Sequence, residues 1–308
     1  MAPGNVCFVT EFILVGLTDH PDLQLPLFFL FLAMYMVTML GNLGLITLIG
    51  LNSHLHTPMY FFLFNLSFTD LCYSSVFTPK MWLNFLSKMN VISYEGCMTQ
   101  FFYCFFALSE CYLLSAMAYD NYVAICNLLL YNIAMSPKVC SSLMFGSYFM
   151  AFSDAMANTG CLLRLTFCDA NIINHYFCDI LPVLQLSCMS TYVNELVVFI
   201  VVSINIFVPN LTIFFSYSFI LCSILHMNST ESRSKAFSTC SSHIIAISLF
   251  FGSFSFMYLQ PSSAGSMNKG KISSVFYTNV IPMMNPLIYS LRNKYVKLAL
   301  RKTLSRRM

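Results

Sequence analysis

The chain has 308 residues, of which 58% are hydrophobic and 9% are charged, and its formal net charge at pH 7 is +3. In soluble domains about a quarter of all residues are charged. This composition therefore excludes an ordinary soluble enzyme, a disordered regulator and a nucleic-acid-binding protein. The first twenty residues lack both a basic start and an early apolar run, so we expect no cleavable signal peptide.

Long apolar runs dominate the chain. A helix that crosses a membrane needs about 20 apolar residues, and the predicted spans are about 25–50, 58–80, 98–121, 140–162, 196–225, 237–260 and 272–291. Buried helices of a large soluble core would keep a polar face, which these runs lack. We therefore predict an all-α membrane protein in which residues 1–308 form a single bundle of seven transmembrane helices.

Lys and Arg residues decide the predicted orientation. With the N-terminus outside, ten of them lie inside (Lys138, Arg233, Lys235, Arg292, Lys294, Lys297, Arg301, Lys302, Arg306, Arg307) and five outside (Lys80, Lys88, Arg164, Lys269, Lys271). We therefore place the N-terminus outside and the C-terminus inside. The basic tail has an apolar face, which predicts a short amphipathic helix over about 292–304 on the anionic inner leaflet. A short flank without fixed structure is the alternative.

Four of the 13 cysteines fall on the predicted outer side: Cys97, Cys168, Cys178 and Cys188. In an oxidising compartment four cysteines can form two bridges. Three pairings are possible, and the spacing does not choose among them. The cysteines in or near the spans are interpreted as small apolar packing residues.

Two carboxylic acids lie in the middle of predicted spans, Asp70 in the second and Glu110 in the third. An ionisable group at this depth is costly unless it is paired or hydrated, so the two could share a proton or hold a small cation such as sodium. The alternative is that each is a neutral, hydrogen-bonded structural acid. Asp154 and His243 are interpreted as structural, and Asp120 closes the third span. Pro286, next to Asn285, predicts a kink that is a plausible hinge.

Several motifs resemble those of olfactory receptors, in the larger class II group of the rhodopsin-like G-protein-coupled receptors. The matching stretches are Gly41-Asn42, LHTPMYFFL at 55–63, LSFTDLCYSS at 66–75, MAYDNYVAIC at 117–126, Ser216-Tyr217, KAFSTCSSH at 235–243 and PMMNPLIYSLRN at 282–293. They cover nearly the whole chain in the family's order. The resemblance implies an odorant receptor in the plasma membrane of olfactory neuron cilia, which raises cAMP through a stimulatory (olfactory-type) heterotrimeric G protein.

The resemblance also implies roles for single residues. Cys97–Cys178 and Cys168–Cys188 would be the outer disulfides, Asp70 and Glu110 would hold a sodium ion, and Tyr217 and Tyr289, beside Asn285 and Pro286, would be switch residues. The odorant would bind among the third, fifth, sixth and seventh spans, at Tyr103, Cys104, Phe106, Ala107, Leu108, Val202, Asn205, Ile206, Phe251, Tyr258 and Thr278. None of these residues is charged, so we expect small, volatile, largely apolar ligands.

The sequence departs from the family pattern at three places. Asp120-Asn121-Tyr122 stands where the family has Asp-Arg-Tyr, and Asn cannot replace a five-donor cation. Leu128 replaces the usual Pro of the following loop. Asn5-Val6-Cys7 lacks the Ser or Thr of a good glycosylation signal, so Asn5 is a poor acceptor.

Three other functions are weighed against the odorant receptor. A transporter or channel would use Asp70 and Glu110, but the chain shows no internal repeat and no paired broken helices. An intramembrane enzyme would need a convergent nucleophile and base, which the sequence does not show, so we expect no enzymatic activity. A receptor-like chain with impaired G-protein coupling is the alternative that Asn121 motivates.

Overall fold

The computed structural model describes residues 9–18, 20–86, 90–167, 171–258, 266–292 and 294–305, and these are almost entirely helical. The helices are α1 (Pro21–Leu51), α2 (Pro58–Leu86), α3 (Tyr94–Phe102), α4 (Phe105–Cys126), α5 (Tyr131–Ala134), α6 (Pro137–Leu162), α7 (Ile180–Leu184), α8 (Tyr192–His226), α9 (Thr230–Tyr258), α10 (Ser266–Val275), α11 (Ile281–Arg292) and α12 (Lys294–Ser305). Two 3-10 turns, η1 (Ser53–Leu55) and η2 (Leu128–Leu130), connect helices, and one π-helical turn, η3 (Phe276–Val280), joins α10 to α11.

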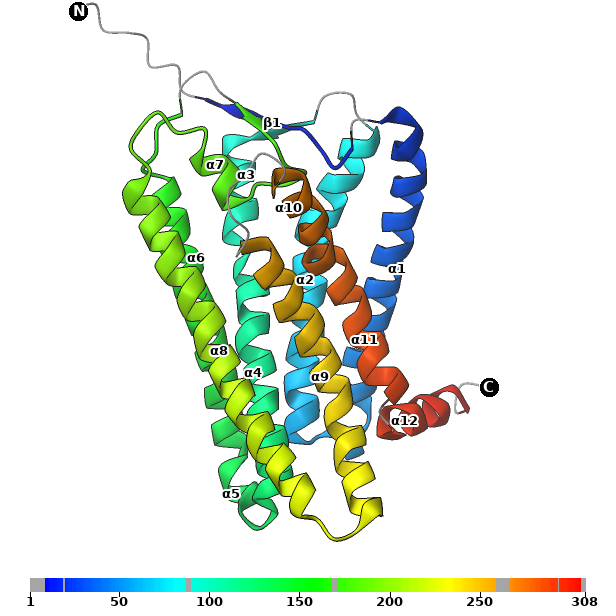
Figure 1. The fold of residues 1–308 in the computed structure, drawn as a ribbon. Helices are drawn as coiled ribbons and strands as arrows, with labels where there is room; N and C mark the ends of the chain where they lie inside the picture. Colours follow the sequence, from blue (N-terminus) through cyan, green and yellow to red (C-terminus); the bar gives the residue numbers. More distant parts are fainter. Residues whose placement is uncertain are drawn as a thin grey trace, which may run out of the picture.

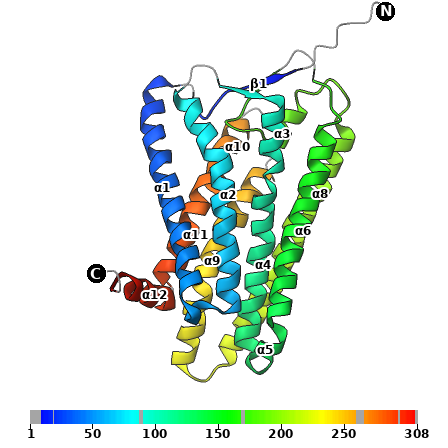
Figure 2. The ribbon, with the colours of Figure 1, turned by 180° about the vertical axis from the view of Figure 1, so that it is seen from behind.

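The long helices lie side by side as one bundle (Figures 1 and 2). A small sheet covers one end, which we call the sheet end. The short helices α5 and α12 lie at the opposite end, which we call the α12 end. Each of the predicted apolar stretches forms one long helix or two consecutive helices. Within the part of the chain that the structure describes, the predicted stretches are therefore helical.

Two of the predicted spans are less regular than expected. The third is divided into α3 and α4 by Tyr103 and Cys104, whose ψ angles of −4° and −14° form a tighter turn before the helix continues. The seventh contains η3, where one helical turn is widened. Wide turns of this kind occur often at functional sites.

Four helical segments among the described residues are long and apolar enough to cross a membrane: Pro21–Leu51, Tyr94–Cys126, Tyr192–His226 and Thr230–Ser253. A fifth is reached if Leu128–Ala134 and Pro137–Leu162, which are bent by 65° to each other, form one span. Both α2 and the α10–α11 segment carry more polar residues, and many of these are buried inside the bundle rather than facing outward. Seven crossings, with the N-terminus outside, therefore remain a prediction.

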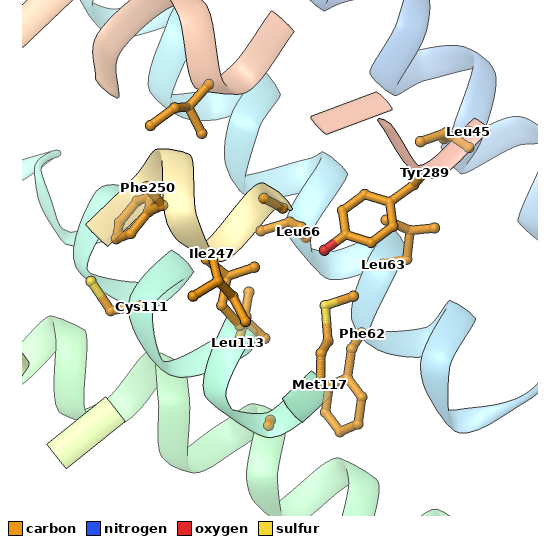
Figure 3. Close-up of a cluster of buried hydrophobic side chains, with 14 of the residues drawn as sticks. Leu45, Phe62, Leu63, Leu66, Cys111, Leu113, Met117, Ile247, Phe250 and Tyr289 are labelled. Atoms are coloured by element: carbon orange, nitrogen blue, oxygen red, sulfur yellow. The ribbon is translucent and has the colours of Figure 1, made fainter. Parts of the chain in front are cut away.

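The core of the bundle is apolar (Figure 3). Side chains from α1, α2, α4, α9 and α11 meet there, among them Leu45, Phe62, Leu63, Leu66, Cys111, Leu113, Met117, Ile247, Phe250 and Tyr289. Large apolar side chains also stay exposed along the outside of the helices, including Leu40 on α1, Phe149 on α6 and Phe207 on α8. Such a surface is stable when lipid rather than water covers it.

Three short strands form a sheet that the sequence analysis did not predict. The central strand β1 (Glu11–Leu14) pairs antiparallel with β2 (Val91–Ser93) and parallel with β3 (Ile172–Ile173). The strand β1 alternates between exposed and buried residues, and Phe12 and Leu14 are buried against a second apolar cluster below the sheet. The sheet thus ties the start of the chain to the segments that precede α3 and α7.

The helix α12 lies across the α12 end, where it contacts α11 and α1 (Figure 1). It begins at Lys294, two residues later than predicted. Val296 is buried against the bundle, while Lys297, Leu298 and Arg301 are exposed. The predicted amphipathic helix is therefore present, with its apolar face packed partly on protein.

Candidate functional site

A polar cluster in the middle of the bundle joins three helices. The Asn285 side chain of α11 donates from Nδ2 to Asp70 Oδ2 of α2 at 3.0 Å and to Glu110 Oε1 of α4 at 2.9 Å. All three residues are at most 3% exposed. The structure therefore brings together the two acids singled out from the sequence, and it adds the amide that bridges them.

Two oxygen atoms of this cluster that accept no hydrogen bond from the described residues are suitable ligands for a small hard cation. Asp70 Oδ1 and Ser74 Oγ, one helical turn apart on α2, are buried and have no hydrogen-bond partner among the described residues. Carboxylate and hydroxyl oxygens are the ligands that hard cations prefer. The described part of the chain holds no group of three or more His, Cys, Asp or Glu side chains that could bind a metal ion. The oxygen set is thus compatible with a monovalent ion.

A second polar cluster lies nearer the α12 end and contains Asn121. Its Nδ2 donates to the Tyr217 hydroxyl at 3.4 Å and lies 3.5 Å from His243 Nδ1, and the Tyr217 hydroxyl lies 2.6 Å from the same ring nitrogen. The amide nitrogen of Asn121 can only donate, so Nδ1 of His243 is an acceptor. The Tyr217 hydroxyl then also donates to Nδ1, and the imidazole is assigned as the neutral Nε2–H tautomer. Asn121 therefore joins α4 to α8 and α9 without any charge.

Asp120 has a neutral partner in the structure rather than an adjacent cation. The Tyr131 hydroxyl of α5 donates to Asp120 Oδ1 at 2.9 Å. No local motif predicts the conformation of the short helix α5, so this contact could not be expected from the sequence. His243, interpreted as merely structural, likewise belongs to the Asn121 cluster.

The hinge region of α11 packs tightly against α1. A Cβ atom added to Gly41 would lie only 2.9 Å from Pro286 Cγ, so only glycine allows this approach. Next to it, Asn42 Nδ2 donates to the Pro282 carbonyl at 3.0 Å. The hydroxyl of Tyr289 is buried without a partner among the described residues, so this switch candidate is not held by a hydrogen bond.

The predicted odorant-binding residues of α4 lie near its N-terminus. Cys104, Phe106 and Ala107 pack against the core, while the ring of Tyr103 is stacked on that of Phe106 at 6.1 Å. Leu108 is half-buried. These side chains thus form an apolar and aromatic surface below the sheet end.

The other predicted pocket residues differ in what they can offer a ligand. Val202 and Ile206 on α8 are half-buried, and Phe251 on α9 is buried. Asn205 donates to Asp154 Oδ2 at 2.9 Å across the α6–α8 contact, so only its unpaired Oδ1 is left for a ligand. The side chain of Tyr258 and the residues Cys168 and Asn5 lie outside the described part of the chain.

The segment between α6 and α8 forms a lid over the sheet end of the bundle. The Cys97–Cys178 disulfide joins it to α3, and Gln100 Oε1 accepts from the Cys178 backbone N–H at 3.0 Å. Cys188 is also in a disulfide. The lid is thus fixed to α3, the helix that directly precedes the pocket candidates of α4.

Tyr176 of the lid is bonded to Thr278 of η3, with 2.9 Å between the two oxygens. The Thr278 hydroxyl donates to the Ser274 carbonyl and accepts from Asn279 Nδ2, so Tyr176 is the donor to Thr278. Asn279 Oδ1 in turn accepts from Thr78 of α2. Tyr176 and Asn279 were not predicted, although the aromatic run before Cys178 is a signal that could have pointed to a buried lid.

Two ionisable groups of the lid have shifted pKa values. Burial, together with the charge of Lys271, lowers the pKa of His175 to about 3. Burial raises the pKa of Asp179 to about 6, although the carboxylate accepts from the Ile180 backbone N–H at 2.7 Å. Asp179 is near enough to Cys104 to interact with it electrostatically. The predicted pocket, described from the sequence as free of charged residues, therefore has a carboxyl group close to its edge.

Comparison with known proteins identifies the family. The model of the olfactory receptor family matches residues 31–307. Human olfactory receptor 8B3 is 72% identical over 305 residues, which are 99% of this chain and 97% of that protein. Mouse olfactory receptor 8B8 is 70% identical over 307 residues, which are 99% of each protein.

Among solved structures, squid rhodopsin shares the fold. The TM-score is 0.74 at 20% sequence identity, and the match covers 93% of this chain and 82% of that chain. This chain therefore belongs to the olfactory receptor family of G-protein-coupled receptors, so it is a multi-pass membrane receptor and not an enzyme.

Proposed function

We propose that this receptor binds a small, volatile, largely apolar odorant below the lid, among α4, α8, α9 and the α10–α11 segment. Binding activates a stimulatory (olfactory-type) heterotrimeric G protein at the α12 end and thereby raises cAMP. The α12 end is cytoplasmic in this proposal, and the receptor acts in the plasma membrane of olfactory cilia. The basic tail and the family resemblance support this orientation.

The observation that carries this proposal is the hydrogen bond between Tyr176 and Thr278. It connects the lid to η3 on the same helical segment that presents Asn285 to the acid pair. Asn285 is seven residues from Thr278, which is about two helical turns. A ligand that shifts Thr278 therefore acts on an element that reaches the centre of the bundle, which is what a population shift between resting and active states requires.

Two exposed aliphatic side chains support a G-protein contact at the α12 end. Leu129 and Leu130 of η2 are 99% and 57% exposed. Exposed apolar patches are typical of protein interaction sites. The Asn121 cluster lies on the neighbouring helix α4, so docking there would act on Asp120 and Asn121 directly.

The function is tested by a cAMP reporter assay with a panel of uncharged and permanently charged odorants in cells that express the receptor. For the agonist that emerges, Tyr176→Phe and Thr278→Val each remove one partner of the same hydrogen bond. A double-mutant cycle on potency should give a coupling energy of about 1 kcal/mol. Tyr192→Phe and Thr212→Val are matched controls, since Tyr192 is exposed and Thr212 bonds only within its own helix among the contacts described. A charged best agonist, or additive effects of the pair, would contradict the proposed pocket.

The acid pair would hold a sodium ion in the resting state. Asp70 and Glu110 carry like charges close together, and a cation between them would allow both to be ionised. Glu110→Gln keeps the acceptor for Asn285 and removes one charge. We expect this variant to lose the dependence of resting activity and thermal stability on sodium, with potassium as the control ion. An unchanged sodium response would instead support two structural acids held by Asn285.

A further inference from the structure

A pocket of about 450 Å³ lies at the sheet end, on the side where α1 and α2 run side by side (Figure 2). Its walls are the segment 15–18 after β1, Gln24 in the first turn of α1, the last turns of α2, Asn90 before β2, and Tyr176 of the lid. The volume is within the range of pockets that hold a small organic molecule. None of the predicted odorant-binding residues lines this pocket, so it is a separate site, which we call the amide pocket.

The backbone wall of the amide pocket is held in place from two sides. The Leu14 N–H donates to the Asn90 carbonyl at 2.8 Å, and the Gly16 N–H donates to the His175 carbonyl at 3.3 Å. Gly16 has a φ of 86°, which residues with a side chain rarely adopt. The wall thus has one fixed course between the lid and the segment before β2. A preformed pocket of this kind costs little ordering when a ligand enters.

The lining combines side-chain amides with an apolar surface. Gln24, Asn84 and Asn90 each bring an amide, in which a donor and an acceptor lie side by side. Gln24 and Asn90 are half-buried. Met81 and Phe85 of α2 add apolar side chains to the same lining. None of the described residues that line the pocket is Asp, Glu, Lys, Arg or His.

We propose that the amide pocket binds an uncharged aromatic carboxamide, whose amide group pairs with Gln24 and Asn90 while its ring packs on Phe85 and Met81. Two amides can exchange two hydrogen bonds, because each has a donor beside an acceptor. A carboxylate would bring acceptors only, and an amidinium would bring donors only. Either charged group would also find no opposite charge among the described lining residues.

Occupancy of the amide pocket acts on the lid through Tyr176. The Tyr176 carbonyl accepts from Asn84 Nδ2 at 3.2 Å, and its hydroxyl donates to Thr278 at 2.9 Å. A ligand packed against this part of the lid restricts Tyr176 and favours its hydrogen bond to Thr278. The carboxamide is therefore a modulator that raises odorant potency from a second site, a consequence that rests on the proposed function.

The binding step is tested with a benzamide that carries a diazirine, on purified full-length receptor in phosphatidylcholine nanodiscs. After illumination we expect labelled residues within 15–24 and 81–86. Unlabelled benzamide should compete at a lower concentration than benzoate or benzamidine. These two molecules have nearly the same shape as benzamide, but the first is an anion with acceptors only and the second a cation with donors only.

Two variants of Gln24 test the recognition of the amide. Gln24→Leu removes the amide at similar size and should raise the benzamide concentration for half-maximal competition by about fivefold, the usual effect of one lost hydrogen bond. Gln24→Glu should reverse the preference, so that benzamidine competes better than benzamide. Gln185→Leu is the matched control, because Gln185 is an exposed glutamine of the lid that does not line the pocket.

Three results would overturn the amide pocket as a carboxamide site. They are labelling mainly within α4 or α8, equal competition by benzamide, benzoate and benzamidine, and unchanged competition by benzamide in the Gln24→Leu variant. None of these measurements needs an odorant or a G protein. A failure of the proposed signalling therefore leaves the test of this site intact.

The coupling to the odorant response is tested with benzamide in the cAMP assay. Benzamide should raise the potency of an agonist on the unmodified receptor. The Tyr176→Phe variant, which keeps the ring and the carbonyl but loses the hydroxyl, should keep the diazirine labelling and show no such gain. No gain in the unmodified receptor, or an equal gain in both receptors, would contradict the coupling.

Discussion

Asn121 is the residue at which this chain differs most clearly from its family in chemistry. It is buried, and its amide holds Tyr217 and His243 in a neutral cluster. The family's Arg would bring a positive charge to the same place, where it could pair with Asp120 and then contact the G protein. Tyr131 supplies a neutral partner for Asp120, and we expect Asn121 to lack the cationic contact to the G protein.

We predict that Asn121→Arg raises the maximal cAMP response to an agonist at matched surface expression. The restored contact to the G protein is a charge-assisted hydrogen bond, worth about 1.5–3 kcal/mol, or about one to two powers of ten in coupling. The control is Asn127→Arg, which adds the same charge at an exposed position six residues after Asn121. This variant should not raise the response. An unchanged or lower response of the Asn121 variant would show that this receptor couples by another route.

Residue-scale prediction from the sequence worked where the signal was an ionisable group in an apolar run. Asp70 and Glu110 were identified in this way, and in the structure both accept a hydrogen bond from the side-chain amide of Asn285. Thr278 was assigned by resemblance, but its partner Tyr176 lies 102 residues away in the chain. Such a contact depends on how the lid folds over the bundle, and no local pattern encodes it. The same reason explains why Tyr131 was missed.

At the scale of elements, the close contact between α1 and α11 depends on Gly41, which has no side chain. The Cβ of an alanine at position 41 would meet Pro286 at 2.9 Å and force the two helices apart. We predict that Gly41→Ala lowers the stability of the purified receptor by about 1–3 kcal/mol, the usual penalty of overpacking. Gly44→Ala on the same helix is the control, because its Cβ would meet no atom within 4 Å. Equal thermal shifts of the two variants would contradict this packing.

The lid gives a prediction for the dependence of stability on pH. Unfolded His175 takes up a proton as the pH falls below about 6.5, whereas the folded residue does so only near 3, so acidification destabilises the lid through this group. Asp179 acts in the opposite direction, because the folded group is protonated below about 6 and the unfolded group only below about 3.9. Among the described residues, the other titratable groups that interact with His175 or Asp179 are Lys271, Tyr176 and Cys104. Between about pH 4 and 6 the effects of His175 and Asp179 therefore oppose each other.

Asp179→Asn removes one of these two effects and keeps a side-chain oxygen that can accept from the Ile180 N–H. We expect its Tm to fall more steeply than that of the unmodified receptor as the pH is lowered from 6 to 4. The two proteins should differ by at most about 3 kcal/mol in how much their free energy of unfolding changes over this pH range. Parallel Tm curves across this range would mean that Asp179 does not titrate as its burial requires.

The elements themselves were predictable to different degrees. The long helices follow from apolar length alone, because a run of that length has few other stable arrangements. The strands β1, β2 and β3 have at most four residues each, and they form only because the lid and the start of the chain meet at the sheet end. The break between α3 and α4 carries no proline or glycine signal of its own and is set by packing in the assembled bundle. The π-helical turn η3 is followed by Pro282, which has no N–H to donate to the Thr278 carbonyl.

At the scale of the whole molecule, polar groups are arranged along the bundle in an otherwise apolar core. They begin at Tyr176 and Thr278 below the sheet end, continue at Asn285 with its two acids, and reach Asn121 near the α12 end. Each cluster joins different helices. Hydrogen bonds of this kind can exchange partners when helices shift, which is how a packed bundle can have two discrete states.

The central claim is that an odorant bound below the lid activates a stimulatory G protein at the α12 end. It is tested most directly with purified receptor in nanodiscs, by measuring nucleotide exchange on added stimulatory and inhibitory G proteins with and without an agonist. We predict agonist-dependent exchange on the stimulatory G protein, with a lower agonist potency for the Tyr176→Phe and Thr278→Val double variant at unchanged receptor concentration. Binding of the agonist without exchange on either G protein, or an agonist-evoked current in membranes that contain no G protein, would contradict this account.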